Sequence, residues 1–173
     1  MSTTHATLHI RWAVLRDIPA LMTIDLDAYK CPLRQTEWRE MLLEHSHLVT
    51  LVAEQDGTVL GFTNYLLARE AIWVERIAVH TLVRRQGIGR AMLAQIQRRV
   101  DKGRRRYAGL LISDDTPDVA DFVRACGWKA HRIYRPAEPC DGTSCVTAYQ
   151  YARRDMAREV LDSILQRDGR VVR

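Results

Sequence analysis

The fold of this chain is decided by the stretch Ile77-Ala78-Val79-His80-Thr81-Leu82-Val83-Arg84-Arg85-Gln86-Gly87-Ile88-Gly89-Arg90-Ala91. Its pattern predicts a short apolar strand, then a basic glycine turn, then the start of a long amphipathic helix. Gly87 and Gly89 carry no Cβ, so the turn can bring backbone N–H groups close to an anion, and the helix adds its positive dipole end. The stretch therefore predicts a site for a phosphorylated ligand.

The spacing of this turn narrows the class of ligand. The pattern Arg84-x-x-Gly87-x-Gly89 matches neither the dinucleotide fingerprint G-x-G-x-x-G nor a Walker loop, which needs a Lys-Ser/Thr pair after its last glycine. It resembles motif A of the GNAT superfamily of N-acetyltransferases, whose pattern is Arg/Gln-x-x-Gly-x-Gly/Ala. The alternative is a strand-to-helix turn that binds nothing; the apolar strand before it and the basic run favour the resemblance.

The resemblance implies that acetyl-CoA is the acetyl donor, and it assigns the contacts. The loop beginning at Arg84 would hold the pyrophosphate through the backbone amides of Arg85, Gln86, Gly87, Ile88, Gly89 and Arg90. The strand before the loop would use its backbone to pair with the pantetheine arm and to stabilise the tetrahedral intermediate; its residues are Ile77, Ala78 and Val79.

Hydrophobic patterning predicts seven strands. They cover residues 10–14, 48–53, 58–67, 71–80, 107–112, 128–134 and 145–151. The Asp56-Gly57 pair predicts a hairpin turn between the second and third strands. The apolar run 107–112 is typical of a strand that is covered on both faces.

Four helices are predicted between these strands. The first is capped by Asp17 and carries an apolar stripe of Ile18, Leu21, Met22 and Leu26. The others cover residues 35–45, 88–102, which Gly103 ends, and 119–126, which stops at Gly127. The resulting order β-α-α-β-β-β-α-β-α-β-β is an α+β sandwich and is also the GNAT order. The resemblance implies a central mixed, mostly antiparallel sheet flanked by helices.

The length of 173 residues suits one domain, and the resemblance covers residues 8–152 of it. The remaining residues 153–173 are predicted to form a C-terminal helical extension, with an apolar stripe that includes Met156, Val160 and Ile164. That stripe packs either on its own domain or on a second copy of the chain as a homodimer, and both alternatives stay open.

Positive charge is concentrated around the predicted loop. The net charge is +5, and the segment 84–106 holds nine Lys/Arg residues against the single acid Asp101. Overlap with the glycine turn makes CoA the simplest partner for this charge. Nucleic acid binding through the run Arg104-Arg105-Arg106 is a weaker alternative, because the chain lacks the interleaved aromatic residues that single-strand binders use.

The sequence predicts neither a membrane nor a metal partner. No apolar run reaches membrane-spanning length and the start lacks a signal-peptide pattern, so a cytoplasmic protein is expected. The cysteines are scattered and have no histidines at zinc-ligand spacing, which favours reduced thiols; they are Cys31, Cys126, Cys140 and Cys145.

A second resemblance concerns the amine that is acetylated. Residues 112–129 resemble the Asn-x-x-Ala-x-x-Leu-Tyr-x-x-Leu-Gly-Phe stretch of GNAT enzymes, with Thr116 in place of the cofactor-binding asparagine. Residues 131–136, followed by Asp141-Gly142, are similar to the end of bacterial enzymes that acetylate the N-terminal alanine of a ribosomal protein. This implies a protein N-terminal α-amino group as acceptor. Other amines, such as a polyamine, an antibiotic or a lysine side chain, stay open.

The catalytic groups of those ribosomal enzymes are missing from this chain. Leu111 stands where they carry a glutamate base and Val123 where they carry a tyrosine acid, and neither side chain can move a proton. A CoA-binding module without turnover is therefore the alternative from another functional class.

Glu75 and Tyr134 are the predicted replacements. Strand alternation puts Glu75 on one face with Trp73, where partial enclosure would raise its pKa and suit it to accept an amine proton, directly or through water. Pairing with an arginine of a neighbouring strand is the other interpretation. Tyr134 is expected in the loop between the last two strands, as a proton donor or an acceptor-binding group, or as a half-buried aromatic. The amine would attack the thioester directly.

Overall fold

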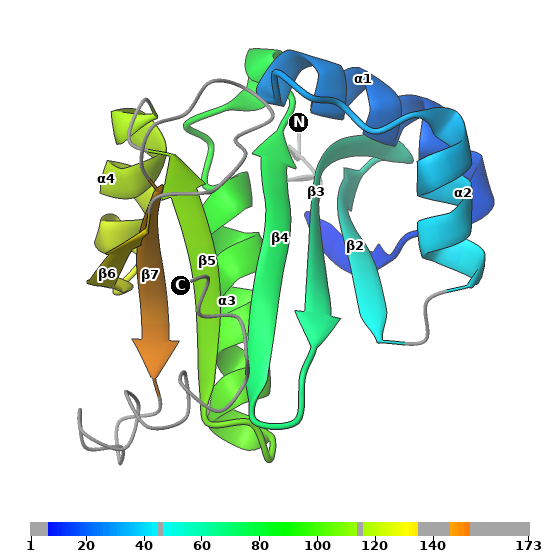
Figure 1. Cartoon of the computed structure of the whole chain (residues 1–173). Coiled ribbons are helices and arrows are strands. Elements are labelled where there is room, and N and C mark those ends of the chain that lie inside the picture. The colour runs from blue at the N-terminus through cyan, green and yellow to red at the C-terminus, as the bar shows by residue number, and fades with distance from the viewer. Residues whose placement is uncertain (1–6, 45–46, 114–115, 135–145, 153–173) are drawn as a thin grey trace. The chain divides into compact units, whose positions relative to one another are not determined.

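The computed structural model describes residues 7–44, 47–113, 116–134 and 146–152 (Figure 1). Its strands are β1 (His9–Trp12), β2 (Leu48–Gln55), β3 (Thr58–Leu67), β4 (Ala71–Val79), β5 (Tyr107–Ser113), β6 (Lys129–Tyr134) and β7 (Val146–Ala152). Its helices are α1 (Ile18–Ala28), α2 (Gln35–Leu43), α3 (Ile88–Lys102) and α4 (Pro117–Ala125), with short 3-10 turns η1 (Leu15–Asp17) and η2 (Thr81–Val83). The predicted order of strands and α-helices is confirmed.

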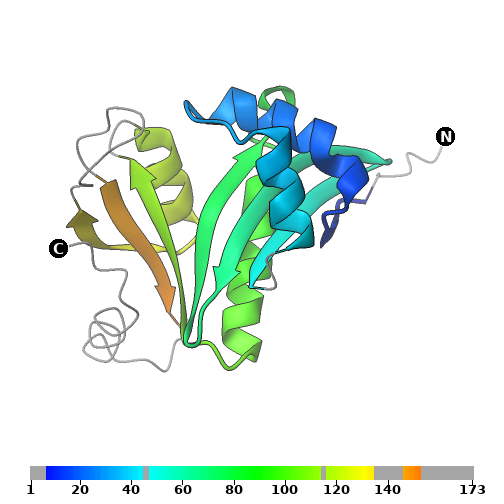
Figure 2. The same ribbon diagram turned by 45° about the vertical axis from the view of Figure 1, so that its right-hand side comes forward.

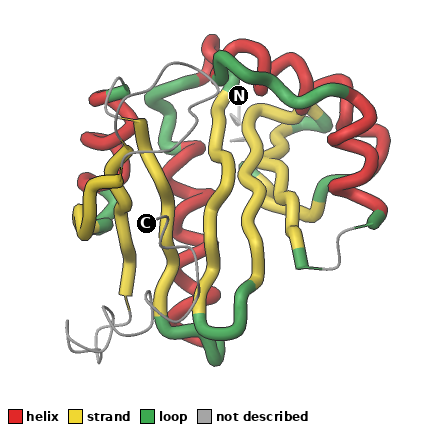
Figure 3. The backbone as a smooth tube through the Cα atoms, viewed as in Figure 1, coloured by secondary structure: helices red, strands yellow, loops and turns green. Residues whose placement is uncertain are grey.

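The chain divides into two compact units, which we describe separately. The first contains the described residues up to Tyr65 together with Arg76–Met92, and the second contains Leu66–Glu75 and the described residues from Leu93 onward. The strand order is β1-β2-β3-β4 in the first unit and β4-β5-β7-β6 in the second. Strands β3 and β4 each have residues in both units. The strands are yellow in Figure 3. No helix in the described part is long and apolar enough to cross a membrane.

Pairing in each unit is mainly antiparallel. In the first unit β1 runs antiparallel to β2, with His9 opposite Glu54. In the second unit β4 and β5 are parallel, with Ala71 opposite Tyr107, whereas β7 is antiparallel to both β5 and β6. The predicted mixed, mostly antiparallel sheet of the GNAT type is therefore confirmed.

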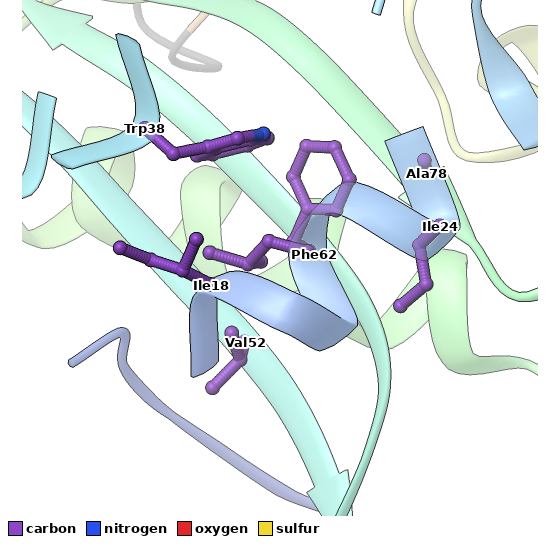
Figure 4. Packing of buried hydrophobic residues seen from close by; sticks show 7 residues of the cluster. Ile18, Ile24, Trp38, Val52, Phe62 and Ala78 are labelled. Carbon is purple, nitrogen blue, oxygen red and sulfur yellow. The ribbon is translucent and has the colours of Figure 1, made fainter. Parts of the chain in front are cut away.

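Helices α1 and α2 cover one face of the strands in the first unit (Figure 2). Helical spacing places apolar side chains of α1 along one stripe, where they meet the strands. The cluster consists of Ile18, Leu21, Ile24, Trp38, Val52, Phe62 and Ala78 (Figure 4). The rings of Trp38 and Phe62 pack edge to face, with centroids 5.1 Å apart. Trp38 is completely buried, so it belongs to this core.

The first turn of α3 covers the opposite face of the same strands. Because side chains alternate along a strand, Val52 faces α1 whereas its neighbour Ala53 packs with Ile88 and Met92 of α3. Close approach between β3 and β4 requires a glycine at position 61, where an added Cβ would lie 2.8 Å from the carbonyl oxygen of Ala78.

The second unit has a core of its own. Trp73 packs edge to face on Tyr107, and its ring fills the space that a side chain at Gly109 would need. Helix α4 ends as predicted at Gly127, whose φ of +86° is a left-handed conformation. The N–H of Trp128 donates to Val123 O and that of Gly127 to Arg124 O, which is the Schellman arrangement of a helix end.

Several expectations were wrong in detail. Asp17 does not cap α1 with its side chain; its carboxylate accepts hydrogen bonds from the Arg11 guanidinium at 2.7 and 2.9 Å and from Val14 N at 2.8 Å. Leu26 was expected in the buried stripe but is 67% exposed, because Ile24 and Asp25 take the buried positions of that turn. Leu111 is 53% exposed, so β5 is not covered on both faces along its whole length.

Some predictions differ only in boundaries or fall outside the described residues. The first strand covers His9–Trp12 rather than residues 10–14, and α2 ends at Leu43. Neither Cys31 nor Cys126 forms a disulfide within the described part of the chain. The predicted extension 153–173 lies outside the described residues, as do Cys140 and Cys145.

Candidate functional site

The glycine turn joins β4 to α3 in the first unit through η2 and residues 84–87. Two of its residues have left-handed backbone conformations, Arg85 with φ +66° and Gly87 with φ +84°. An added Cβ at Gly87 would meet no atom within 4 Å, so the glycine is required by backbone conformation and not by crowding. A left-handed arginine is uncommon, and such residues gather at functional sites.

The start of α3 presents backbone donors to this turn. The first bond of the helical ladder runs from Ala91 N to Gly87 O, at 2.9 Å. The N–H groups of the first four positions of a helix have no partner inside the helix, and they carry the positive end of its dipole. These positions are Gly87, Ile88, Gly89 and Arg90, four of the six residues whose amides were predicted to bind pyrophosphate. The arrangement suits a phosphorylated ligand.

Arginine side chains surround the same turn. Arg84, Arg85 and Arg90 are all exposed. The Arg84 Nε donates to the carbonyl oxygen of Val79 at 3.0 Å, which ties the turn back to the end of β4. This end of the first unit therefore combines helix-start amides with positive charge, which is the chemistry that anionic oxygens require.

The last residues of β4 present their main-chain groups on alternate edges. The carbonyl oxygen of Ala78 is directed at Gly61 of β3, and His80 N donates to Leu60 O of the same strand. Ile77 and Val79 present their groups on the opposite edge. Ile77 and Val79 therefore remain the candidates for main-chain contact with a ligand. The carbonyl of Ala78 is turned toward β3.

The hydroxyl of Tyr29 occupies the main-chain groups of Ile77. It accepts a hydrogen bond from Ile77 N at 2.9 Å and donates one to Ile77 O at 3.1 Å. Tyr29 is the residue at which the chain leaves α1, with an extended backbone. Burial raises the pKa of Tyr29 to about 12, so the hydroxyl keeps its proton at neutral pH.

An ion pair holds Tyr29 in place. The Arg76 guanidinium lies over the Tyr29 ring, 4.5 Å from its centroid. Arg76 also pairs with the fully buried Asp25 of α1 at 2.7 Å and donates to the Cys31 carbonyl at 2.8 Å. The second oxygen of Asp25 accepts from Leu33 N at 2.6 Å. These contacts fasten the connection between α1 and α2 to β4, next to the glycine turn.

Sequence reasoning missed Asp25, Tyr29 and Arg76. The sequence carries a signal for two of them, Asp25 and Arg76. Asp25 follows Ile18 and Leu21 at helical spacing, so a carboxylate stands at a position that faces the core and needs a cation. Arg76 is a charged residue on an apolar strand. Neither signal identifies the partner, because the residues lie 51 positions apart in the chain.

The remaining predicted site residues belong to the second unit. Glu75 is exposed on β4, so the expected enclosure beside Trp73 is wrong. Thr116 is exposed and immediately precedes α4. Tyr134 is not in a loop but is the last residue of β6, opposite Val146 of β7. The first unit thus brings the predicted loop and strand residues together, whereas Glu75, Thr116 and Tyr134 lie in the other unit.

Three further residues make structural contacts. His80 accepts a hydrogen bond from Leu82 N through Nδ1, as the cap of η2. Val123 is fully buried in the core of the second unit. Arg105, from the basic run, donates to the Ala68 carbonyl at 3.0 Å. No group of three metal-ligating side chains occurs among the residues that the structure describes.

Comparisons with known proteins agree with this geometry. Residues 46–130 match the family model described as "Acetyltransferase (GNAT) domain". No curated protein sequence matches the chain.

Solved structures share the fold at low sequence identity. The ribosomal-protein-S18-alanine N-acetyltransferase from Escherichia coli superimposes with a TM-score of 0.72 at 18% identity, over 87% of this chain and 99% of that one. A ribosomal-protein-alanine N-acetyltransferase from Brucella melitensis gives 0.71 at 20% identity, over 83% and 99%. A chimeric spermidine N-acetyltransferase from Vibrio cholerae gives 0.73 at 12% identity, over 84% and 95%. At these identities the likeness establishes the fold.

Proposed function

This chain carries an acetyltransferase domain of the GNAT family, and from that premise we propose that it transfers an acetyl group from acetyl-CoA to a primary amine, with a protein N-terminal α-amino group as the acceptor. The observation that carries the proposal is the turn from β4 into α3, where left-handed Arg85 and Gly87 lead into the helix-start amides. A pyrophosphate bound there would be held by those amides and by the charges of Arg84, Arg85 and Arg90.

The reaction needs no covalent enzyme intermediate. The neutral amine attacks the thioester carbonyl carbon, a C–N bond forms, and the C–S bond breaks as the tetrahedral intermediate collapses to the amide and CoA thiolate. The amine loses a proton and the departing thiolate gains one, so a proton acceptor and a proton donor are both required. A main-chain N–H near the carbonyl oxygen would stabilise the intermediate. Ile77 N, which donates to the Tyr29 hydroxyl in this structure, would be such a group once that hydroxyl moves away.

Glu75 and Tyr134 remain our candidates for the proton transfers. Glu75 is an exposed carboxylate one residue before Arg76 on β4, so water can reach it and relay a proton from the amine. Tyr134 ends β6 and carries an ionisable hydroxyl. At the positions used by the ribosomal enzymes, Leu111 and Val123 offer no ionisable group.

Two lines of support favour a protein N-terminus as the acceptor. Residues 131–136 resemble the end of ribosomal-protein-alanine N-acetyltransferases, and two such enzymes share the fold. A small amine is the second candidate, because a spermidine N-acetyltransferase shares the fold equally well. Because the shared fold fits both kinds of acceptor, the preference for an N-terminal acceptor rests on the sequence resemblance.

A competition experiment separates these acceptors. The protein is incubated with isotopically labelled acetyl-CoA and an equimolar mixture of free N-terminal peptides, N-blocked lysine peptides and polyamines, and products are read by mass spectrometry. We expect label on the α-amino groups of the free peptides. Label on lysine or polyamine alone would contradict the N-terminal acceptor but keep the acetyltransferase, whereas acetyl-CoA binding without any product would favour a CoA-binding module.

A further inference from the structure

We propose that Tyr29 is a latch on β4, whose hydroxyl fills the main-chain hydrogen-bonding positions of Ile77 until acetyl-CoA takes them. The latch goes beyond the transfer reaction, although it rests on the proposed function. It makes the entry of the acetyl donor a competition with a side chain of the protein itself.

The two contacts of the Tyr29 hydroxyl carry this inference. Ile77 N donates to the hydroxyl at 2.9 Å, and the hydroxyl donates to Ile77 O at 3.1 Å. A phenolic O–H has one proton and can accept through its lone pairs, so one group satisfies both main-chain partners. Two amides of an extended ligand can offer the same pair, a carbonyl from one and an N–H from the other, when the ligand adds to a strand edge.

The Ile77 N–H cannot serve both partners at once. An N–H group makes one good hydrogen bond, so a ligand carbonyl that approaches Ile77 N must displace the hydroxyl from it. Pantetheine contains two amides, and a thioester adds a third carbonyl. Acetyl-CoA therefore competes with Tyr29 directly at Ile77 N.

The Tyr29 side chain packs against the core cluster of the first unit, and the backbone around it is held by contacts of other groups. Tyr29 follows the last residue of α1, and its backbone N–H remains bonded to Asp25 O at 2.9 Å whatever the side chain does. The Arg76 guanidinium lies 4.5 Å from the ring centroid and is itself anchored by Asp25. The anchor therefore stays while the phenol changes rotamer, so the latch resets when the ligand leaves.

The substitution Tyr29→Phe tests the latch, because it removes the hydroxyl and keeps the ring under Arg76. Isothermal titration with acetyl-CoA should give a Kd about fivefold tighter than that of the original protein, since the ligand no longer displaces a hydrogen-bonded hydroxyl. Tyr151→Phe is the matched control: it removes a hydroxyl that bonds Asp101 at 2.9 Å in the other unit, and it should leave the Kd unchanged.

The outcomes separate the latch from the proposed function. Binding of acetyl-CoA to neither protein would overturn the proposed function. Binding to both with equal Kd, or weaker binding to Tyr29→Phe, would overturn the latch alone. If Tyr29→Phe does not fold, tyrosine ring carbons labelled with ¹³C report on the unsubstituted protein by NMR. The Tyr29 signal should then shift as acetyl-CoA saturates the protein, and an unmoved signal would overturn the latch.

Discussion

Arg76 Nη1 lies 2.7 Å from Oδ1 of Asp25, a carboxylate with no exposed surface. This pair joins α1 to β4 in the first unit, and its guanidinium lies over the ring of Tyr29. Removing the cation would leave a buried charge without compensation, which is among the most costly changes a folded protein can suffer.

Arg76→Ala should therefore lower the free energy of unfolding by about 3 kcal/mol, measured by urea denaturation. The exposed pair Arg124–Asp121, 3.5 Å apart, provides the control. Arg124→Ala should cost less than about 0.5 kcal/mol, because solvent screens an exposed pair. Equal losses for the two substitutions would show that Asp25 does not depend on Arg76 for its burial.

Asp17 should give the first unit a stability that disappears in acid. Burial acts to raise the pKa of Asp17, but hydrogen bonds from Arg11 and from Val14 N outweigh it and hold the pKa below 3.8. A carboxyl with a lowered pKa in the folded state stabilises it at pH values above its unfolded pKa, and the contribution is lost as pH falls through the folded pKa.

Asp17→Asn should then lose about 2 kcal/mol at neutral pH and show a flatter decline of stability below about pH 4. Urea denaturation from pH 7 to pH 3 measures both effects. Glu37→Gln is the comparison, because Glu37 pairs with Arg34 on the surface, where the contribution is screened. If the free energy of unfolding of Asp17→Asn falls in acid as steeply as that of the original protein, Asp17 does not cause the loss of stability.

The glycine turn allows a matched test of acetyl-CoA binding. Gly87 and Gly57 both have positive φ, +84° and +78°, and at both an added Cβ would meet no atom within 4 Å. Alanine should therefore cost each about 1 kcal/mol of stability through backbone strain alone. Only Gly87→Ala should weaken the binding of acetyl-CoA, with a Kd raised about fivefold or more, because only Gly87 leads into the helix-start amides. Similar Kd values for both variants would mean that the phosphates bind elsewhere.

Glu75→Gln tests the proposed proton acceptor. A carboxylate that accepts the amine proton contributes about a hundredfold or more to the rate, so kcat/KM should fall by about that factor and its pH dependence should flatten. Glu70→Gln provides a control in the hairpin at the other end of β4, and its kinetics should be unchanged. If Glu75→Gln keeps the original pH profile, the proton leaves through water or another residue.

The sequence predicted the fold well, because local chemistry dictates most of it. The Asp56-Gly57 turn, the stripe of α3 and the helix stop at Gly127 each depend on residues a few positions apart, and all appear as expected. Ala78 packs in one cluster and Ile77 and Val79 in another, as the alternation of side chains along a strand requires. The glycine turn was predictable for the same reason, since its backbone conformation depends on consecutive residues.

The wider site was not predictable from local patterns. The contacts of Tyr29 with Ile77 and of Asp25 with Arg76 join residues about fifty positions apart, and no spacing rule connects them. The prediction that Glu75 is partly enclosed was wrong for a related reason. Alternation predicts the face on which a side chain lies, but its exposure depends on what covers that face.

The most direct test of the central claim follows both products of one reaction. The protein is mixed with acetyl-CoA and a peptide bearing a free N-terminus, and the released CoA and the acetylated peptide are quantified over time by liquid chromatography and mass spectrometry. Acetyl transfer by direct attack predicts one CoA released for each acetyl group gained, at a rate that depends on the amine concentration and falls in Gly87→Ala. If acetyl-CoA binds but stays intact in the presence of every class of amine, the proposed acetyl transfer is contradicted.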